Sequence, residues 1–401
     1  MRSLLLLAVL AARALAARPF LNEPDTGLNP FLFGQNATDE CPVPSTPQSQ
    51  GGAEGCLPDI NIAKGLPDYE AIARKCLPAR NYTYYRNGAA GEYTYRRNLA
   101  IFHQYTFRPR ILVDISKIES TLSTTILGYN FSAPFYISPC AQAGMAHPNA
   151  EINFVKAAAK ENILYMPALF ATRTIEEIAE AKAEGQVLFQ QLYLSATNDT
   201  ETEELIRRTE KAGAKAIVFT VDSAADGNRH RAARYDVGSA DSSYSAFTWE
   251  YYVKLTTMTK LPIILKGVMS FADVQLAIKY KVAGIILSNH GARQLDGAPT
   301  SLEVAIEIHQ KDPEIFKKMD ILADGGVRYG TDVLKLLALG VKAVGVGRPF
   351  MFANIFGQEG VEQLIRQLKK EIALDAANLG CPDLREINDN FVDWNPKQCV
   401  D

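Results

Sequence analysis

Eight short apolar runs, each followed by an amphipathic stretch, restrict the fold of this chain more than any other feature. The runs are residues 134–139, 163–168, 187–193, 216–222, 262–267, 283–289, 320–326 and 343–349. Most of their residues are apolar at successive positions, which is typical of parallel strands that are covered on both faces. Eight strands with intervening helices is the number that closes a TIM barrel. The sequence therefore predicts an α/β fold, a TIM (β/α)8 barrel.

A doubly wound open sheet is the alternative, but it requires a glycine-rich GxGxxG turn after its first strand. Here the first run continues as SPCAQAG (138–144), which lacks that pattern. Helix starts agree with the strand–helix alternation. Capping boxes are predicted at Thr174 and at Thr200, and Thr300 precedes an amphipathic stretch in the same manner.

The N-terminal region divides into two predicted segments before the barrel. Residues 1–17 have a basic Arg2, an apolar stretch and an A-x-A pattern, which together indicate a signal peptide cleaved after Ala16 or Ala17. Residues 18–58 form a Pro/Gly-rich arm, and residues 59–401 form the barrel domain. A helical and extended segment that begins near Pro67 precedes the first barrel strand.

Secretion is the localisation that this leader predicts. Four N-x-S/T sequons agree with it, at Asn36, Asn81, Asn130 and Asn198. The chain ends Cys-Val-Asp, unlike the peroxisomal signal SKL. The six cysteines are Cys41, Cys56, Cys76, Cys140, Cys381 and Cys399. None has zinc-type spacing, so we expect no metal site, and a disulfide among Cys41, Cys56 and Cys399 remains open.

Charge and hydropathy exclude two classes of partner. The net charge is −3 and the pI is about 6.1, which argues against a nucleic-acid binder. Beyond the first twenty residues no apolar run is long enough to span a membrane.

Polar residues recur where the predicted strands end, and a TIM barrel builds its active site at that rim. The polar residues are Gln191, Tyr193, Thr220, Asp222, Lys266, Ser288, His290, Arg293, Asp324, Arg328 and Arg348, and Gly347 lies among them at the end of the last strand. The last two strand ends combine glycines with an arginine each, a composition that suits a phosphate group.

His290 is the candidate general base of this rim, and Asp222 is placed to orient its ring. Arg293, three residues further, suits a carboxylate clamp. Lys266 has two possible roles, because a barrel lysine either stabilises negative charge on a cofactor ring or forms a Schiff base, as in aldolases. The residues alone leave this choice open.

Two long motifs, SNHGARQLDGAPTS (288–301) and ADGGVRYGTDVLKLLALGVKAVGVGRP (323–349), closely resemble the FMN-dependent 2-hydroxy-acid oxidase/dehydrogenase family, which includes glycolate oxidase and flavocytochrome lactate dehydrogenase. The resemblance extends upstream to YTYYRNGAAGEYTYRRN (82–98) and to residues 108–128. It covers about residues 60–392. It implies an FMN cofactor and a 2-hydroxy acid as substrate.

The resemblance also implies a role for each matching residue. His290 would be the base, with Asp222 as its partner, and Lys266 would lie beside flavin N1 and O2. Substrate contacts would come from Tyr84, Tyr193, Arg229 and Arg293. FMN contacts would come from Tyr85, Gln191, Thr220, Ser288, Asp324, Arg328, Gly347 and Arg348, in addition to Lys266.

Two departures from the family concern the pocket walls. Ala168 stands where the family has a serine, and Phe170 occupies the position of a bulky pocket residue. The loop from Arg229 to Trp249 is shorter than in the family. We expect a retained reaction on a larger L-2-hydroxy acid.

The electron acceptor is expected to be oxygen, which would yield hydrogen peroxide. The arm up to residue 58 is too short for a haem-binding domain, so an internal electron relay is not expected. The alternatives are a dehydrogenase or monooxygenase outcome, a flavin-binding protein without turnover, and an aldolase that uses Lys266. Relatives of this kind often form tetramers, so a homo-oligomer is expected.

Overall fold

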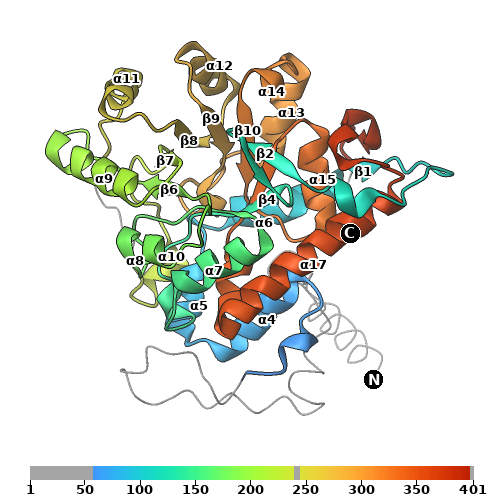
Figure 1. The fold of residues 1–401 in the computed structure, drawn as a ribbon, viewed down its shortest axis with the longest axis horizontal. Coiled ribbons are helices and arrows are strands. Elements are labelled where there is room, and N and C mark those ends of the chain that lie inside the picture. Colours follow the sequence, from blue (N-terminus) through green and yellow to red (C-terminus); the bar gives the residue numbers. More distant parts are fainter. Residues whose placement is uncertain (1–56, 239–243, 398–401) are drawn as a thin grey trace, which may run out of the picture.

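The structure is a computed structural model that describes residues 57–238 and 244–397. Its centre is a sheet of eight parallel strands surrounded by helices (Figure 1). The strands are β4 (Phe135–Ile137), β5 (Leu164–Tyr165), β6 (Phe189–Leu192), β7 (Ala216–Thr220), β8 (Ile263–Val268), β9 (Gly284–Leu287), β10 (Asp320–Asp324) and β11 (Ala343–Val346). Each lies within one of the eight apolar runs, except that β8 extends one residue beyond its run, to Val268.

Strand order shows that the sheet closes on itself. Neighbours run β5-β4-β11-β10-β9-β8-β7-β6, and the pairing of β4 with β11 joins the first strand to the last. A parallel bridge between Tyr165 and Leu188 connects β5 to β6 and completes the circle. The predicted TIM barrel is therefore confirmed.

Helices follow the strands and cover the outside of the barrel (Figure 1). They are α7 (Glu151–Glu161), α8 (Ile175–Glu180), α9 (Asp199–Lys211), α10 (His230–Ala233), α11 (Trp249–Met258), α12 (Phe271–Lys279), α13 (Ser301–Lys311), α14 (Ile315–Lys318), α15 (Gly330–Ala338), α16 (Arg348–Ala353) and α17 (Gly357–Asn378). Single 3-10 turns are η1 (Ile60–Ile62), η2 (Ile101–Gln104), η3 (Ile118–Thr121), η4 (Ala143–Met145), η5 (His290–Ala292), η6 (Asn354–Phe356), η7 (Leu384–Glu386) and η8 (Asp389–Phe391).

Two of the three predicted helix starts are correct. Thr174 and Thr300 each form a capping box with the glutamate three residues later. The prediction at Thr200 is wrong, because α9 begins two residues earlier, where the side chain of Asn198 accepts a hydrogen bond from the Glu201 amide. An asparagine oxygen caps a helix at least as well as a threonine hydroxyl, so the earlier residue becomes the cap.

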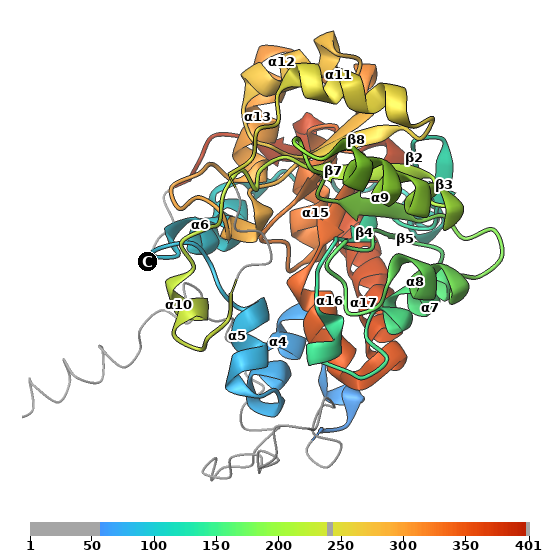
Figure 2. The ribbon, with the colours of Figure 1, turned by 90° about the vertical axis from the view of Figure 1, so that its left-hand side faces the viewer.

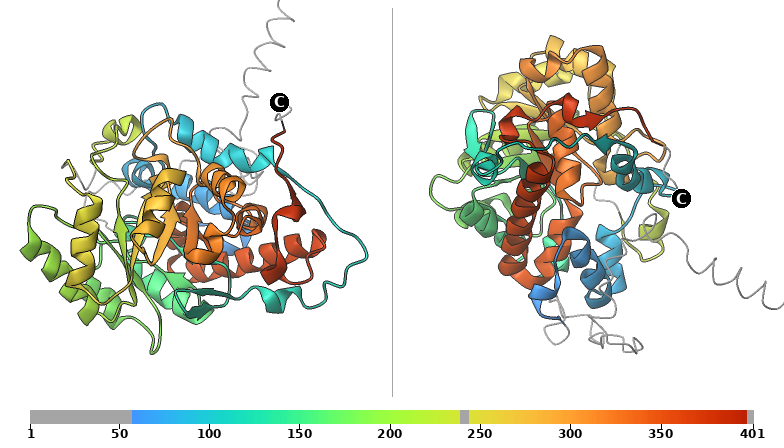
Figure 3. Two further views of the ribbon diagram at one scale, coloured as in Figure 1. Left: turned by 90° about the horizontal axis from the view of Figure 1, so that it is seen from above. Right: turned by 90° about the vertical axis from the view of Figure 1, so that its right-hand side faces the viewer.

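The segment before the barrel contributes α4 (Leu66–Cys76), α5 (Ala79–Tyr85) and α6 (Tyr93–Ala100). Figure 2 shows α4 and α5 beneath the barrel beside α16 and α17, with α10 next to α5. In a view from the other side, α17 runs along this region (Figure 3, right). The predicted helical segment near Pro67 is α4, with Pro67 in its first turn.

Apolar side chains close the interior of the barrel at the amino-terminal ends of its strands, where Leu127, in the turn between β2 (Thr124–Ile126) and β3 (Tyr129–Phe131), donates to Asp320 at the start of β10. An apolar cluster fills this end from the strands, and Ile126 and Phe131 join this cluster from the β2–β3 hairpin. A further pair, β1 (Thr106–Phe107) and β12 (Val392–Asp393), is antiparallel. Because the amino-terminal end is plugged, a site that opens to solvent along the barrel axis has to lie at the carboxyl ends of the strands.

Several sequence-based expectations lie outside the described residues, namely the leader 1–17, most of the arm, Asn36, Cys41, Cys56 and Cys399. Cys140 and Cys381 are thiols in the structure. Within 57–238 and 244–397 no helix has the length and apolar character to cross a bilayer. The same residues contain no cluster of metal-ligating side chains.

Candidate active site

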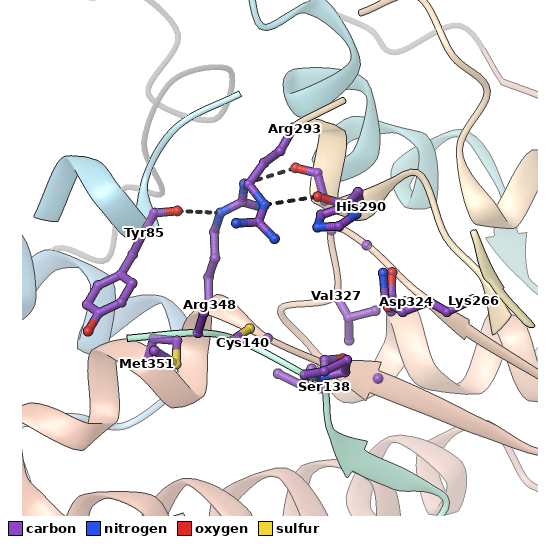
Figure 4. A pocket seen from close by; sticks show the side chains of 18 of the residues that line it. Tyr85, Ser138, Cys140, Lys266, His290, Arg293, Asp324, Val327, Arg348 and Met351 are labelled. Atoms are coloured by element: carbon purple, nitrogen blue, oxygen red, sulfur yellow. Dashed lines mark hydrogen bonds and ion pairs between the residues drawn. The ribbon is translucent and has the colours of Figure 1, made fainter. Parts of the chain in front are cut away.

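A cavity opens at the carboxyl ends of the strands, as predicted. Its empty volume is about 690 Å³, and an adjoining hollow measures about 590 Å³. The predicted residues on their walls are Tyr84, Tyr85, Gln191, Tyr193, Thr220, Arg229, Lys266, His290, Arg293, Asp324, Arg328, Gly347 and Arg348. In Figure 4, His290 and Arg293 face the cavity from one side, and Ser138, Cys140 and Met351 lie on the opposite side.

His290 is paired with Asp222. The Nδ1 atom of His290 lies 2.9 Å from Oδ1 of Asp222, and the histidine is 9% exposed. Burial lowers the pKa of His290 to about 3, although the charge of Asp222 acts in the opposite direction. Burial would raise the pKa of Asp222, but His290 and Lys266 outweigh this effect and lower it. The resting pair is thus a carboxylate and a neutral imidazole, the state in which histidine accepts a proton.

The carboxylate of Asp222 is held behind the histidine by close packing. A Cβ atom on Gly267, which has φ +110°, would lie 2.4 Å from the Asp222 Cβ. Only a glycine at position 267 therefore lets the end of β8 approach the Asp222 side chain this closely. Oδ2 of Asp222 is buried and has no hydrogen-bond partner among the described residues.

A left-handed turn aims the His290 ring into the cavity. His290, Gly291 and Ala292 have φ values of +60°, +62° and +62°. Positive φ costs about 1–2 kcal/mol for residues other than glycine, so the turn requires support. Asn289 supplies part of it, because its Oδ1 accepts a hydrogen bond from the Ala292 amide at 3.0 Å.

Lys266 brings a buried positive charge to the inner end of the cavity. Its Nζ donates to Ser288 Oγ at 3.1 Å and lies 4.0 Å from Asp324 Oδ2. Burial alone would lower the pKa of Lys266, but Asp222 and Asp324 raise it above its ordinary value, so the lysine stays protonated. Burial raises the pKa of Asp324, against the opposing charge of Lys266.

Ser288 lies behind the cavity wall. The resemblance implies that it contacts the flavin ring, which stays a prediction; the residue is 0% exposed and is not among the residues that line the cavity. Its hydroxyl accepts hydrogen bonds from Lys266 Nζ and from the His290 amide at 3.1 Å each. Ser288 therefore fixes the lysine and the histidine relative to each other.

The adjoining hollow is cationic and aromatic. Arg293 donates through Nε to the His290 carbonyl at 3.2 Å. Tyr84 and Tyr193 lie on the walls, and burial raises the pKa of both, so their hydroxyls remain protonated donors. The ring of Phe170 stacks on Tyr193 at 5.3 Å with an interplanar angle of 22°. This composition suits a carboxylate that carries an apolar substituent.

Gln191 and Thr220 are bonded to each other on the wall shared with this hollow. Gln191 Nε2 donates to Thr220 Oγ1 at 2.9 Å, and its Oε1 accepts from the Leu169 amide at 3.1 Å. The amide orientation is thereby set, and the Thr220 hydroxyl hydrogen is left for a ligand acceptor.

The glycine-rich ends of β10 and β11 form the far end of the cavity. Gly326 has φ +83°, and a Cβ there would lie 2.0 Å from the Asn98 carbonyl oxygen. Arg328 donates to the Val327 carbonyl at 3.0 Å and lies 3.5 Å from Glu70. A Cβ at Gly347 would lie 3.1 Å from Cys140 Sγ.

Arg348 has a second task beyond the predicted phosphate contact. Its guanidinium donates to the carbonyls of Tyr85, Asn87 and Gly291 at 2.8, 2.7 and 2.9 Å. Burial lowers its pKa to about 10, so it remains charged at neutral pH. Arg348 therefore links the segment around Tyr85 to the turn at His290 through hydrogen bonds. Its Nη1 makes no hydrogen bond within the described ranges. Tyr85 itself donates its hydroxyl to the Gln142 carbonyl at 2.7 Å.

The end of β4 was missed by sequence reasoning. Ser138, Pro139, Cys140 and Ala141 line the cavity, although none of them is among the predicted site residues. Their position at the end of an apolar run is the same signal that predicts the other residues of the rim. Asn98 was also missed; its side chain exchanges two hydrogen bonds with Asn289, at 2.9 and 2.8 Å.

The residues present fit FMN. Ser138 is 6% exposed, and its Oγ has no partner among the described residues although it faces the cavity wall at Gly345. Buried hydroxyls are normally hydrogen-bonded, so this atom indicates a polar ligand. Glycines that exclude a Cβ, two arginines at one end, and a buried lysine at the other match a phosphate and an electron-accepting ring.

Comparisons with known proteins agree with this geometry. The FMN-dependent dehydrogenase family matches residues 73–244 and 237–394. The L-lactate dehydrogenase (cytochrome) of Wickerhamomyces anomalus is 37% identical over 360 residues, which are 84% of this chain and 62% of that protein. A peroxisomal (S)-2-hydroxyacid oxidase of Arabidopsis thaliana is 37% identical over 354 residues, 82% of this chain and 95% of its own length.

A solved structure gives the same result for the fold. The flavin-binding domain of baker's yeast flavocytochrome b2 superposes with a TM-score of 0.81 at 35% identity, covering 86% of this chain and 90% of that one. The chain therefore belongs to the family of FMN-dependent 2-hydroxy-acid oxidases and dehydrogenases, and it is an FMN-dependent oxidoreductase.

Proposed function

We propose that the chain oxidises an L-2-hydroxy acid to the 2-oxo acid and that oxygen is reduced to hydrogen peroxide. The observation that carries the proposal is the neutral His290, paired with Asp222 and facing a hollow that contains Arg293. In the overall reaction the substrate loses two protons and two electrons, which oxygen takes up as hydrogen peroxide.

The side chains of the chain divide the work of this reaction. Arg293 binds the substrate carboxylate, because its Nε is occupied by the His290 carbonyl and the two Nη groups form a fork. Nε2 of His290 takes a proton from the substrate. The charge of Asp222 stabilises the imidazolium that results. FMN, when bound, supplies the two-electron acceptor, and Lys266 holds a positive charge where negative charge develops.

Relatives support oxygen as the acceptor. The Arabidopsis relative is named an oxidase, and this name supports oxygen over the acceptor of the cytochrome-type dehydrogenase. The test is an anaerobic visible spectrum of the purified holoenzyme with a panel of L-2-hydroxy acids, followed by air. Bleaching, reoxidation and peroxide support the proposal. Bleaching with slow reoxidation points to another acceptor, and no bleaching points to a protein without turnover.

A larger substrate is favoured by the stacked pair of Phe170 and Tyr193 beside the small Ala168. A flat aromatic wall offers offset stacking to an aromatic side chain, worth about 0.5–1.5 kcal/mol. In the same panel we expect higher kcat/KM for an aromatic hydroxy acid than for glycolate. A preference for glycolate would contradict this proposal and leave the reaction class intact.

Secretion with glycosylation is proposed from the leader and the sequons. Asn130 and Asn198 are exposed, whereas Asn81 lies in α5 and its Nδ2 donates to the Met145 carbonyl at 2.8 Å. A glycan would replace one of the two Nδ2 hydrogens and would need space beside this bond at a half-buried residue. We expect a mature N-terminus after Ala16 or Ala17 and glycans on Asn130 and Asn198 but not Asn81. Protein sequencing and glycopeptide mass spectrometry of protein from a secreting cell test both points.

A homo-oligomer, expected to be a tetramer, is proposed from an exposed apolar segment. Ile111 and Leu112 are 85% and 101% exposed, on a stretch that runs outside the helices (Figure 3, left). Contact with another copy would cover them. Light scattering of the purified chain measures the mass, and we expect Leu112→Ser to lower it. A monomeric wild-type protein would contradict the proposal.

A further inference from the structure

Gln294 follows Arg293 in the motif and has no part in the chemistry described above. Its side chain nevertheless contacts Arg229, which lines the substrate hollow. Nε2 donates to Ser223 Oγ at 2.9 Å and to the Ala225 carbonyl at 3.0 Å, and Oε1 accepts from the guanidinium of Arg229. One amide therefore joins both ends of segment 223–229 to the histidine motif.

Arg229 needs such a tether because it lies beside a like charge. Burial, and then the charge of Arg293, lower the pKa of Arg229 to about 10. Its Nε donates to the Arg293 carbonyl at 3.0 Å. Because Nε and Nη2 are occupied, Nη1 is the nitrogen that remains for a ligand in the hollow that Arg229 lines. An arginine without these bonds would gain hydration by turning toward the rim.

The two segments also fit together as backbone. A Cβ on Gly227 would lie 2.1 Å from the carbonyl oxygen of Arg293. Segment 223–229 therefore approaches the histidine motif only because a glycine stands at this position. The position of Arg229 is consequently set by the same short stretch that carries His290 and Arg293.

We propose that Gln294 is a positioning residue that holds Arg229 in the substrate hollow against the repulsion of Arg293. Both arginines are thereby presented to one substrate carboxylate. The inference rests on the proposed function, since it takes a carboxylate as the ligand. The amide acts through Arg229 and does not touch the substrate.

The test measures oxalate binding to the holoenzyme through the change in its flavin absorbance. Oxalate has the carboxylates but no hydrogen to lose, so the readout is independent of turnover. We expect Gln294→Leu to weaken binding about tenfold, and KM for a hydroxy acid to rise more than kcat falls. Arg229→Met should weaken binding similarly, and the double variant should show no further loss.

A matched control is Gln186→Leu. Gln186 also bridges two backbone groups, the Val155 carbonyl and the Ala183 amide at 2.8 and 3.1 Å, far from the hollow. We expect no change in oxalate binding for this variant. If Gln294→Leu does not fold, Gln294→Glu is used; it keeps the acceptor for Arg229 but sets an oxygen against the Ala225 carbonyl, and we expect weakening of a few-fold.

Three results would overturn the inference. The first is that the Gln294→Leu variant binds oxalate as tightly as the wild type. The second is that Gln294→Leu weakens oxalate binding by the same factor in the Arg229→Met background, and the third is that the wild-type holoenzyme does not bind oxalate. Failure of the proposed function looks different. In that case oxalate binding follows the expected pattern while no hydroxy acid bleaches the flavin.

Discussion

Replacing Asp222 with asparagine tests the proton-transfer part of the site most directly. The substitution keeps the shape and an oxygen acceptor for His290 Nδ1 but removes the negative charge 2.9 Å away. Two unit charges about 4 Å apart interact by about 4 kcal/mol at an effective dielectric constant of about 20. The asparagine amide dipole retains part of this attraction. The stabilisation of the protonated histidine should therefore fall by about 3 kcal/mol, which corresponds to a fall of roughly 10²-fold in the rate of proton transfer.

The assay is flavin reduction by a saturating hydroxy acid, followed by anaerobic stopped-flow absorbance. Deuterium at C2 should give a larger isotope effect in Asp222→Asn, because the step that breaks this bond becomes slower. The matched control is Asp296→Asn, which removes a carboxylate that caps α6 through the Tyr93 and Thr94 amides at 3.2 and 2.7 Å. A reduction rate within a factor of about three of wild type, with FMN bound, would refute the role of Asp222.

Three further predictions concern single side chains. Burial lowers the pKa of His290 to about 3 in the folded chain, so the histidine is neutral there, whereas in the unfolded chain it binds a proton below about pH 6.5. Lowering the pH from 7 to 5 should therefore reduce the free energy of unfolding by about 2 kcal/mol through this residue. Urea unfolding of His290→Gln should lack that component; an unchanged pH slope would contradict it. Arg293→Lys should raise KM about tenfold or more, since the bidentate fork is lost, and equal KM values would refute the clamp. Ser138→Ala should weaken FMN binding by a few-fold to tenfold in fluorescence titration of the apoprotein, and unchanged affinity would mean that the buried hydroxyl does not contact the cofactor.

The barrel was readable from the sequence because its signal is collective. Each apolar run, such as 216–222, is ambiguous by itself, but eight runs with helices between them leave little choice. Helix starts depend on one hydrogen bond, and there the sequence offers competing acceptors. Asn198 and Thr200 are both good caps, and only the tertiary path of the chain decides between them.

The residues of the site could be predicted from the sequence because strand ends meet at one rim. The hydrogen-bond partners of these residues could not be predicted. Ser288 and Arg348 illustrate the difference. Both stand in motif positions that imply cofactor contacts, yet Ser288 supports Lys266 and His290 from behind, and Arg348 uses two nitrogens on backbone carbonyls. Hydrogen bonds to backbone carbonyls depend on loop geometry, which has no sequence pattern of its own.

The turn at His290 shows why the two ends of the site depend on each other. The left-handed conformation of Gly291 can be expected from its residue type, but nothing in the sequence predicts the left-handed conformations of His290 and Ala292. They persist because neighbours bind the turn: the Ala89 amide donates to the Ala292 carbonyl at 2.8 Å, and Arg348 donates to the Gly291 carbonyl at 2.9 Å. Strain of about 1–2 kcal/mol per residue is held only while these bonds exist. Arg348, which is predicted to bind the cofactor phosphate, therefore also holds the turn of the predicted base His290, and we expect cofactor binding and proton transfer to share this structural support.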